Sequence, residues 1–404
     1  MEGIMKTLSF VNSSLVQANP QERIAMSAKL EDSIYCAKYE RRRQISNGAS
    51  SSVFCVKLRG KKGEQLFAAK YLKSNSSSSR REVEILRKLQ RGQNILRLLD
   101  TFYCEFHIIL VTEYLAGGNL FERLSNSEYK LTEAKCQIFV RQILRGLEFM
   151  HSLGVVHLDI KPFNILFANK NDDFGLKISD FGSAQELGEE KEVKFNKIKG
   201  SVEFISPELI HCEPVGTQTD MWSVGVVAYM LVSGGVSPFY SAASVSPSSH
   251  LSCLCVVRKT RIHEMVAKKK AKSLIQQLLV RNSADRLTAR QALDHPWMDS
   301  DRVYVDVLFE LETTWMRKCL ARRRWYRALN ALRAMHTMRK FSLPDSPSEE
   351  EEDEESTDVA PQAARIAVVE EKLEEPRQFE EYRLKYESVC LIGSGTFGSV
   401  YYIR

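Results

Sequence analysis

Apolar and polar residues follow a strand-like spacing in the front part of the chain. Residues 52–58 partly alternate, residues 66–72 form a second apolar run, and residues 106–114 form a third. Between the second and third runs, apolar residues recur at helical spacing over residues 80–90. This pattern predicts a β-sheet accompanied by one helix.

Helical spacing dominates the part that follows. Residues 132–151 are amphipathic, and residues 220–232 are apolar almost all round, which is typical of a buried helix. A strand-rich front and a helix-rich back predict an α+β domain of two lobes, over residues 38–115 and 116–298. Residues 1–37 show no sustained period, and we expect them to be a poorly ordered leader.

Composition limits the class of protein. The chain has 404 residues, of which 44% are hydrophobic, so that two or three domains and linkers are expected. No apolar run reaches the ~18–20 residues that a membrane span needs. The nine cysteines have no zinc-site spacing and indicate a reduced, cytoplasmic protein. The formal net charge of +6 argues against a nucleic-acid partner.

That net charge conceals two segments of opposite sign. Residues 316–340 carry nine Lys and Arg and no acidic residue, whereas residues 348–358 carry eight acidic residues and no basic one. The acidic block cannot bury a core, and we expect residues 342–379 to be a disordered linker.

The most informative pattern is an ordered series of three motifs. They are His157-Leu158-Asp159-Ile160-Lys161-Pro162-Phe163-Asn164, Asp180-Phe181-Gly182 and Ser206-Pro207-Glu208. Phosphoryl transfer from ATP needs metal ligands, a cation on the phosphates and an acceptor for the proton of the attacking hydroxyl. Asn164 and Asp180 can hold Mg²⁺ together if residues 165–167 and 176–178 form a hairpin.

In this series, together with Lys70 and a glutamate on the next helix, the sequence resembles the eukaryotic protein kinases. The resemblance covers residues 38–298 and implies the two-lobed kinase fold, with an antiparallel sheet and one helix in the N-lobe and a mostly helical C-lobe. It implies that Asp159 is the catalytic base, that Lys161 contacts the transferred phosphate, and that Asn164 and Asp180 bind Mg²⁺.

The resemblance also implies an ATP site. Lys70 would hold the α- and β-phosphates and pair with Glu82, although Glu84 is an alternative because the spacing from Lys70 to Glu82 is short. Arg286 and Glu208 would form a structural pair, and Asp220 another brace. The further residues expected at the nucleotide are Ile45, Ser46, Asn47, Gly48, Ala49, Ser50, Ser51, Ser52, Val53, Ala68, Thr112, Glu113, Leu115 and Asn119.

Two positions depart from the family pattern. The nucleotide loop of the family reads Gly-x-Gly-x-x-Gly, and only Gly48 is kept here. Glycine lets backbone amides approach phosphate, so this loop puts ATP affinity in question. Phe163 stands where the family usually has glutamate, which concerns the choice of substrate more than the chemistry.

The basic segment is rich in good helix formers. Trp325, Leu329, Leu332 and Met338 occupy relative positions 1, 5, 8 and 14, which suits a helix clasped by calmodulin. The segment resembles the calmodulin-binding segment of myosin light chain kinases. The resemblance implies that residues 299–341 inhibit the kinase and that calcium-calmodulin relieves this inhibition. A membrane-surface helix and a plain packing helix are the alternatives.

Residues 380–404 contain Gly393-Ser394-Gly395-Thr396-Phe397-Gly398, a complete glycine-rich loop. We expect the truncated start of a second kinase domain, with a chance hairpin as the alternative.

The sequence thus predicts an ATP- and Mg²⁺-dependent serine/threonine kinase of the myosin light chain kinase type, activated by calcium-calmodulin. It would be cytoplasmic, with cytoskeletal association as one option, and the myosin regulatory light chain is one candidate substrate. The rival hypotheses are a death-associated or giant-muscle-type kinase with other substrates, and a calmodulin-binding pseudokinase scaffold.

Overall fold

The computed structural model describes residues 20–48, 51–61, 63, 65–126, 128–195, 202–235, 238–239, 269–299, 310–311, 365–369, 388–395 and 398–403. The chain divides into two compact units. The first comprises Met1–Tyr240 and Cys253–Arg324, and the second comprises Ser241–Ser252 and Trp325–Arg404. No helix within the described residues is long and apolar enough to cross a membrane.

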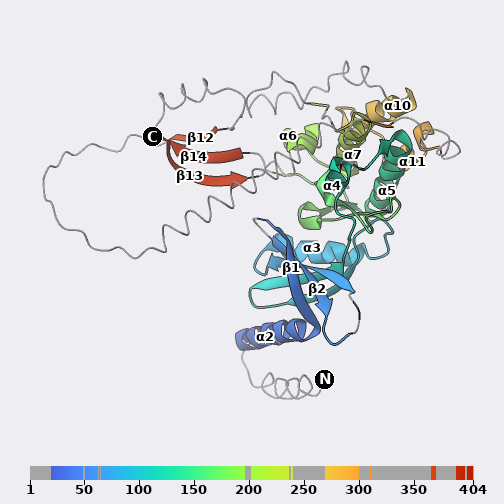
Figure 1. The fold of residues 1–404 in the computed structure, drawn as a ribbon. Helices are drawn as coiled ribbons and strands as arrows, with labels where there is room; N and C mark the ends of the chain where they lie inside the picture. The colour runs from blue at the N-terminus through green and yellow to red at the C-terminus, as the bar shows by residue number, and fades with distance from the viewer. Residues whose placement is uncertain are drawn as a thin grey trace, which may run out of the picture. The chain divides into compact units, whose positions relative to one another are not determined.

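The N-lobe of the first unit is a five-stranded antiparallel sheet with the strand order β1-β2-β3-β5-β4. Figure 1 shows this lobe with β1, β2 and α3 labelled. Its elements are β1 (Tyr39–Asn47), β2 (Ser51–Leu58), β3 (Leu66–Lys73), α3 (Ser77–Lys88), β4 (Leu98–Tyr103) and β5 (His107–Glu113). The predicted strands and the predicted helix are present. The strand β4 was not predicted, because its buried and exposed positions do not alternate.

The register of the sheet places Lys70 in its middle. On β3, Lys70 is opposite Val53 of β2 and Leu110 of β5, and Ala68 is opposite Thr112. The helix α3 buries Glu82, Val83 and Leu86 on one face. Sheet and helix together therefore bring Lys70 and Glu82 to the same side of the lobe.

The leader prediction is wrong for residues 20–37, because α2 (Pro20–Lys38) is a helix. Its last turn carries Ile34 and Tyr35 into an apolar cluster that includes Tyr39 and Phe102 of the sheet. The ring of Tyr35 lies 5.7 Å from that of Tyr39 and 5.4 Å from that of Phe102. The apolar contacts of α2 in this cluster come from neighbouring positions near its last turn and not from a helical stripe, so the spacing in the sequence did not reveal the helix.

The C-lobe is mostly helical and encloses one large apolar core. Its helices are α4 (Leu120–Ser125), α5 (Glu133–Ser152), α6 (Pro207–Ile210), α7 (Thr217–Val232), α10 (Lys269–Leu278) and α11 (Ala289–Leu293). Its short strands are β6 (Leu131–Thr132), β7 (Val155–Val156), β8 (Ile165–Phe167), β9 (Leu176–Ile178) and β10 (Gln185–Glu186). Its 3-10 turns are η1 (Pro162–Asn164), η2 (Phe181–Ser183), η3 (Val202–Phe204), η4 (Ser283–Asp285) and η5 (Pro296–Met298). The fold is thus the α+β, two-lobed arrangement that the sequence predicts.

The helix α7 is buried along its whole length, as predicted. One of its residues, Trp222, has an exposed fraction of 1% and lies against the guanidinium of Arg286. Arg286 donates to Glu208 at 2.8 and 3.1 Å, so the predicted structural pair is present.

The segment after the kinase domain contributes β11 (Glu310–Leu311). It pairs antiparallel with β6, with Glu310 opposite Thr132 and Leu311 opposite Leu131. Two residues of the predicted autoinhibitory segment therefore bond to the strand that precedes α5.

The second unit contains a three-stranded antiparallel sheet of β12 (Arg365–Val369), β14 (Gly398–Ile403) and β13 (Ser388–Gly395). The strand β12 lies within residues 342–379, which the sequence analysis predicts to be a disordered linker. That prediction is therefore wrong for residues 365–369. The run Arg-Ile-Ala-Val-Val of β12 is apolar and lies beyond the acidic block, so charge alone was a poor guide to the boundary.

Replacement of Tyr35 by alanine should lower the free energy of unfolding by about 3–5 kcal/mol, because it leaves a cavity in an aromatic cluster. Tyr35→Phe keeps the ring and loses only the hydrogen bond from the Tyr71 hydroxyl, so it should cost about 1 kcal/mol. Chemical denaturation measures both values.

The matched control is Lys29→Ala, an exposed change on the same helix, which should stay within about 0.5 kcal/mol of the original protein. Equal effects of Tyr35→Ala and Lys29→Ala would contradict the packing of α2 on the sheet.

Candidate functional site

The loop that precedes η1 is held by the buried carboxylate of Asp220, at the start of α7. Its oxygens accept from the backbone amides of His157 at 2.9 Å and Leu158 at 2.8 Å, and from His151 Nε2 at 2.9 Å. Burial alone would raise the pKa of Asp220, but these hydrogen bonds outweigh burial and hold the pKa below its usual value. The ionised carboxylate therefore fixes the loop.

This bracing is needed because Leu158 has a φ of 63°, a conformation that costs a residue other than glycine about 1–2 kcal/mol. The side chain of Leu158 is buried among Val156, Ile205, Leu209 and Val215. An apolar cluster therefore holds Leu158 at the position just before Asp159, and its side chain offers no cation for a phosphate.

The side chains of Asp159, Lys161 and Asn164 meet at the end of this loop. Lys161 Nζ donates to Asp159 Oδ2 at 2.7 Å, and Asn164 Nδ2 donates to the same oxygen at 3.0 Å and to the backbone oxygen of Asp159 at 2.8 Å. Both donors orient the carboxylate of Asp159. The three predicted catalytic residues thus form one cluster.

The predicted hairpin is present and joins this cluster to Asp180. Ile165 of β8 is opposite Ile178 of β9, so that Asn164 and Ser179 lie at its open end. The backbone amide and the hydroxyl of Ser179 both donate to the backbone oxygen of Asn164, each at 2.9 Å. Ser179, which the sequence analysis did not select, therefore closes the hairpin beside both proposed metal ligands.

Lys70 forms two ion pairs, one within the N-lobe and one to the C-lobe. Its Nζ lies 2.6 Å from Glu82 Oε1 on α3 and 2.7 Å from Asp180 Oδ1 in the C-lobe. Burial alone would lower the pKa of Lys70, but the two carboxylates raise it above its usual value. The charge of Lys70 lowers the pKa of Asp180 to about 2, so this carboxylate is ionised throughout the physiological range.

The choice between Glu82 and Glu84 is decided by the face of α3. Glu82 is 3% exposed and pairs with Lys70, whereas Glu84 is exposed. Spacing along the chain could not settle this, because it does not fix the orientation of the helix.

The donors of Asn164 and Asp180 fit Mg²⁺. Amide and carboxylate oxygens are the ligands that this hard cation prefers. Because Asn164 Nδ2 donates to Asp159, its Oδ1 is the end left for a cation. Asp180 uses Oδ1 for Lys70 and is half exposed at its side chain. Asn164 and Asp180 would hold Mg²⁺ here, and the ion would supply positive charge against the negative charge that develops during phosphoryl transfer.

The strands that flank the glycine-poor loop still form a tight turn. Ser46 is opposite Val53 and Asn47 is opposite Ser52, whose hydroxyl donates to Asn47 Oδ1 at 2.8 Å. The amide of Gly48 donates to the backbone oxygen of Ser51 at 2.8 Å, and Gly48 does not adopt a left-handed φ. Ile45 precedes this turn with an exposed fraction of 42%. Ala49 and Ser50 lie outside the described residues.

The connection between the lobes contains Thr112, Glu113 and Leu115. Thr112 is 5% exposed, and its hydroxyl donates to the backbone oxygen of Glu113 at 3.2 Å. The Glu113 side chain pairs with Lys177 at 2.7 Å, and Leu115 is half-buried.

Asn119 has a role that the sequence analysis did not foresee. Its Oδ1 accepts from the backbone amide of Glu122 at 2.8 Å and caps the N-terminus of α4. The proposed contact of Asn119 with nucleotide would compete with this cap. The proposed calmodulin anchors Trp325, Leu329, Leu332 and Met338 lie outside the described residues.

A carboxylate, an amide and a lysine around the β8–β9 hairpin, with Lys70 paired to Asp180, are the arrangement expected of a phosphotransferase of the kinase type. Residues 39–298, more than half of the chain, match the family described as "Protein kinase domain". The chain belongs to the protein kinase family, and within it to the serine/threonine kinases.

Several muscle and calmodulin-dependent kinases are similar to this chain. Smooth muscle myosin light chain kinase of Gallus gallus is 32% identical over 329 residues, which cover 80% of this chain and 16% of that protein. Calcium/calmodulin-dependent protein kinase type 1 of Caenorhabditis elegans is 32% identical over 311 residues, covering 76% and 87%. The chain therefore spans a small part of the chicken protein and most of the worm protein.

Among solved structures, the autoinhibited serine kinase domain of the giant muscle protein titin is similar, with a TM-score of 0.61. It is 26% identical, and the match covers 70% of this chain and 86% of the titin domain.

Replacement of Glu82 by glutamine should lower the free energy of unfolding by about 1–3 kcal/mol, because a buried Lys70 loses one of its two anionic partners. The matched control is Glu84→Gln on the same helix. Glu84 is exposed and does not pair with Lys70, so this change should alter the free energy of unfolding by less than about 0.5 kcal/mol. Urea denaturation compares the two. Equal losses would show that the pair with Glu82 has no special role.

Proposed function

We propose that this chain transfers the γ-phosphoryl group of ATP to serine or threonine hydroxyls of a protein substrate. The observation that carries the proposal is the joint placement of Asp159, Lys161 and Asn164 with Asp180 and Lys70. Asp159 accepts the proton of the substrate hydroxyl, and Lys161 and Lys70 stabilise phosphate charge. Asn164 and Asp180 hold Mg²⁺ on the phosphates.

The nucleotide would lie between the lobes. Residues 45–53 cover its phosphates, Ala68 and Leu115 contact the adenine, and the backbone of Glu113 bonds to it, with Thr112 behind. Asn119 is proposed to contact the nucleotide if its cap on α4 is released. These placements rest on the resemblance to kinases and on the position of the residues around Lys70.

We further propose that the segment after the kinase domain keeps the enzyme inactive and that calcium-calmodulin releases it. The bond of β11 to β6 supports a tail held against the C-lobe. The apolar packing of Leu158 supports control by the tail rather than by a phosphate on the segment that follows Asp180. The relatives include a kinase whose name states calmodulin dependence.

The substrate class is a protein with an accessible serine or threonine, and the myosin regulatory light chain is the first candidate. The ring of Phe163 lies 4.6 Å from that of Phe121, so an aromatic pair occupies the position next to Lys161. A giant-muscle-type kinase with another substrate is the second candidate, favoured by the similarity to titin. A cytoplasmic protein with cytoskeletal association fits either.

The test is phosphate transfer by the full chain to a light-chain peptide and to a panel of other peptides, with and without calcium-calmodulin. We expect transfer only with calcium-calmodulin. Asp159→Ala should reduce it by at least about 100-fold, because the general base is lost. Trp325→Ala should weaken calmodulin binding by about 30-fold, because it removes the aromatic anchor.

Each outcome separates the candidates. Transfer to another peptide but not to the light chain would favour the giant-muscle type. Calmodulin binding without transfer to any peptide would favour a pseudokinase scaffold. Activity that is equal with and without calcium-calmodulin would contradict the proposed switch.

A further inference from the structure

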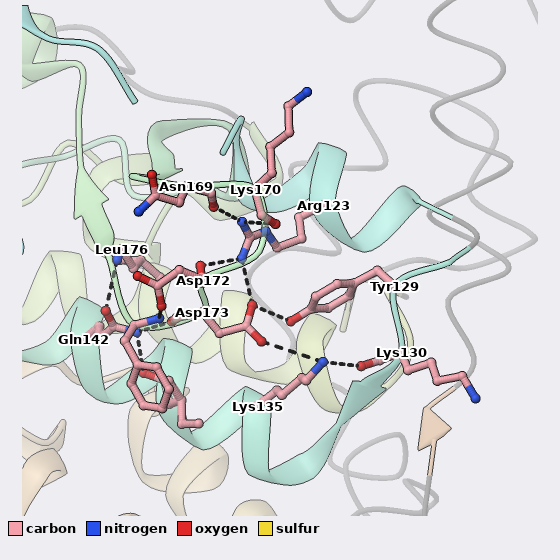
Figure 2. A network of polar contacts seen from close by, with 12 residues as sticks. Arg123, Tyr129, Lys130, Lys135, Gln142, Asn169, Lys170, Asp172, Asp173 and Leu176 are labelled. Atoms are coloured by element: carbon pink, nitrogen blue, oxygen red, sulfur yellow. Dashed lines mark hydrogen bonds and ion pairs between the residues drawn. The ribbon is translucent and has the colours of Figure 1, made fainter. Parts of the chain in front are cut away.

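The side chain of Arg123 points from α4 into the turn that connects β8 and β9 (Figure 2). It is 4% exposed, and its guanidinium carbon lies 3.7 Å from the centre of the Phe167 ring. An arginine in this position has lost nearly all of its water and must bond to the protein instead.

The turn supplies four acceptors for this arginine. Arg123 Nη1 donates to the backbone oxygen of Asp172 and to Asp173 Oδ1, each at 2.7 Å. Its Nη2 donates to the backbone oxygens of Asn169 and, at 2.9 Å, Lys170. Because a guanidinium presents its donors in a rigid, planar fork, these bonds fix the path of the turn and not only its distance from α4.

A second side chain holds the β9 side of the same turn. Gln142 of α5 donates through Nε2 to the backbone oxygen of Asp173 at 2.7 Å and accepts from the amide of Leu176 at 3.0 Å (Figure 2). Asp173 also accepts from the Tyr129 hydroxyl at 2.8 Å and lies 3.6 Å from Lys135 Nζ. The turn is therefore tied to α4 along residues 169–173 and to α5 at its β9 side.

The hairpin that this turn closes is only three residue pairs long. A short hairpin has little stiffness of its own, so its register depends on the contacts that hold its strands from the side and on those that hold its two ends. Ser179 closes the open end, and Arg123 with Gln142 closes the turn. Asn164 lies immediately before β8, and Asp180 lies two residues after β9, so any shift between the strands changes the distance between the proposed metal ligands.

We propose that Arg123 and Asp173 are positioning residues for the metal site, acting through the β8–β9 turn on the separation of Asn164 from Asp180. The inference rests on the proposed function, since it assigns Mg²⁺ to these two ligands. Neither Arg123 nor Asp173 touches the metal. Their loss should therefore weaken the binding of Mg²⁺ more than it weakens the contacts of the nucleotide itself.

The experiment measures binding of a non-hydrolysable ATP analogue to the full chain over a series of Mg²⁺ concentrations. Arg123→Met should raise the Mg²⁺ concentration for half-maximal effect by about tenfold, as expected when a group that orients metal ligands is removed. Arg123→Lys keeps the positive charge but loses the planar guanidinium donors. Asp173→Asn keeps the size of the side chain but loses its negative charge. Both should give smaller increases, of about threefold.

The matched control is Arg290→Met. This arginine forms an exposed ion pair with Glu148 and Asp294, and its loss should leave the Mg²⁺ dependence unchanged. Circular dichroism checks that each variant is folded. If Arg123→Met does not fold, the Mg²⁺ dependence of Asp173→Asn and Arg123→Lys decides the question.

Three outcomes can be told apart. A raised Mg²⁺ requirement, with analogue binding restored at high Mg²⁺, supports the inference. A lower melting temperature with an unchanged Mg²⁺ requirement overturns it and leaves Arg123 as a brace of the C-lobe. An original protein that binds the analogue without any response to Mg²⁺ overturns the proposed function, and this inference with it.

Discussion

The arrangement of the site depends on one buried cation, Lys70, which pairs with Glu82 of the N-lobe and Asp180 of the C-lobe. These ion pairs hold three elements together: the strand β3, the helix α3 and the segment that follows the β8–β9 hairpin. A buried lysine without these partners would be costly, so each element stabilises the position of the other two. The same contacts keep Asp180 ionised and place it where phosphates and Mg²⁺ would meet.

The sequence was informative where chemistry restricts residue type. The order of Asp159, Asn164 and Asp180 predicted both the fold and the cluster, because few proteins need these side chains at this spacing. The sequence was less informative where the orientation of a helix or its packing determines which residues are in contact. Glu82 and Glu84 differ only in the face of α3 that they occupy, and α2 is held by Tyr35 near one end. The structure, and not the spacing, resolves both.

Polar residues that support the site were the hardest to find. Ser179, Arg123 and Gln142 bond mainly to backbone oxygens and amides, which leave no trace in the residue pattern. Asn119 shows the converse: the resemblance to kinases suggested the nucleotide as its partner, and the structure shows that its side chain also caps α4. Both follow from one fact, that a side chain can be assigned a partner only when the path of the backbone around it is known.

The central claim is that Lys70 organises a Mg²⁺–ATP site, and calorimetry of ATP binding to the full chain tests it most directly. We expect Mg²⁺ to strengthen binding in the original protein, and Lys70→Met to weaken binding of Mg²⁺–ATP by about 10–100-fold, because a charged hydrogen-bond donor is lost. Lys73→Met, at an exposed position on the same strand, should bind as the original protein does. Equal affinities of Lys70→Met and the original protein would contradict the account.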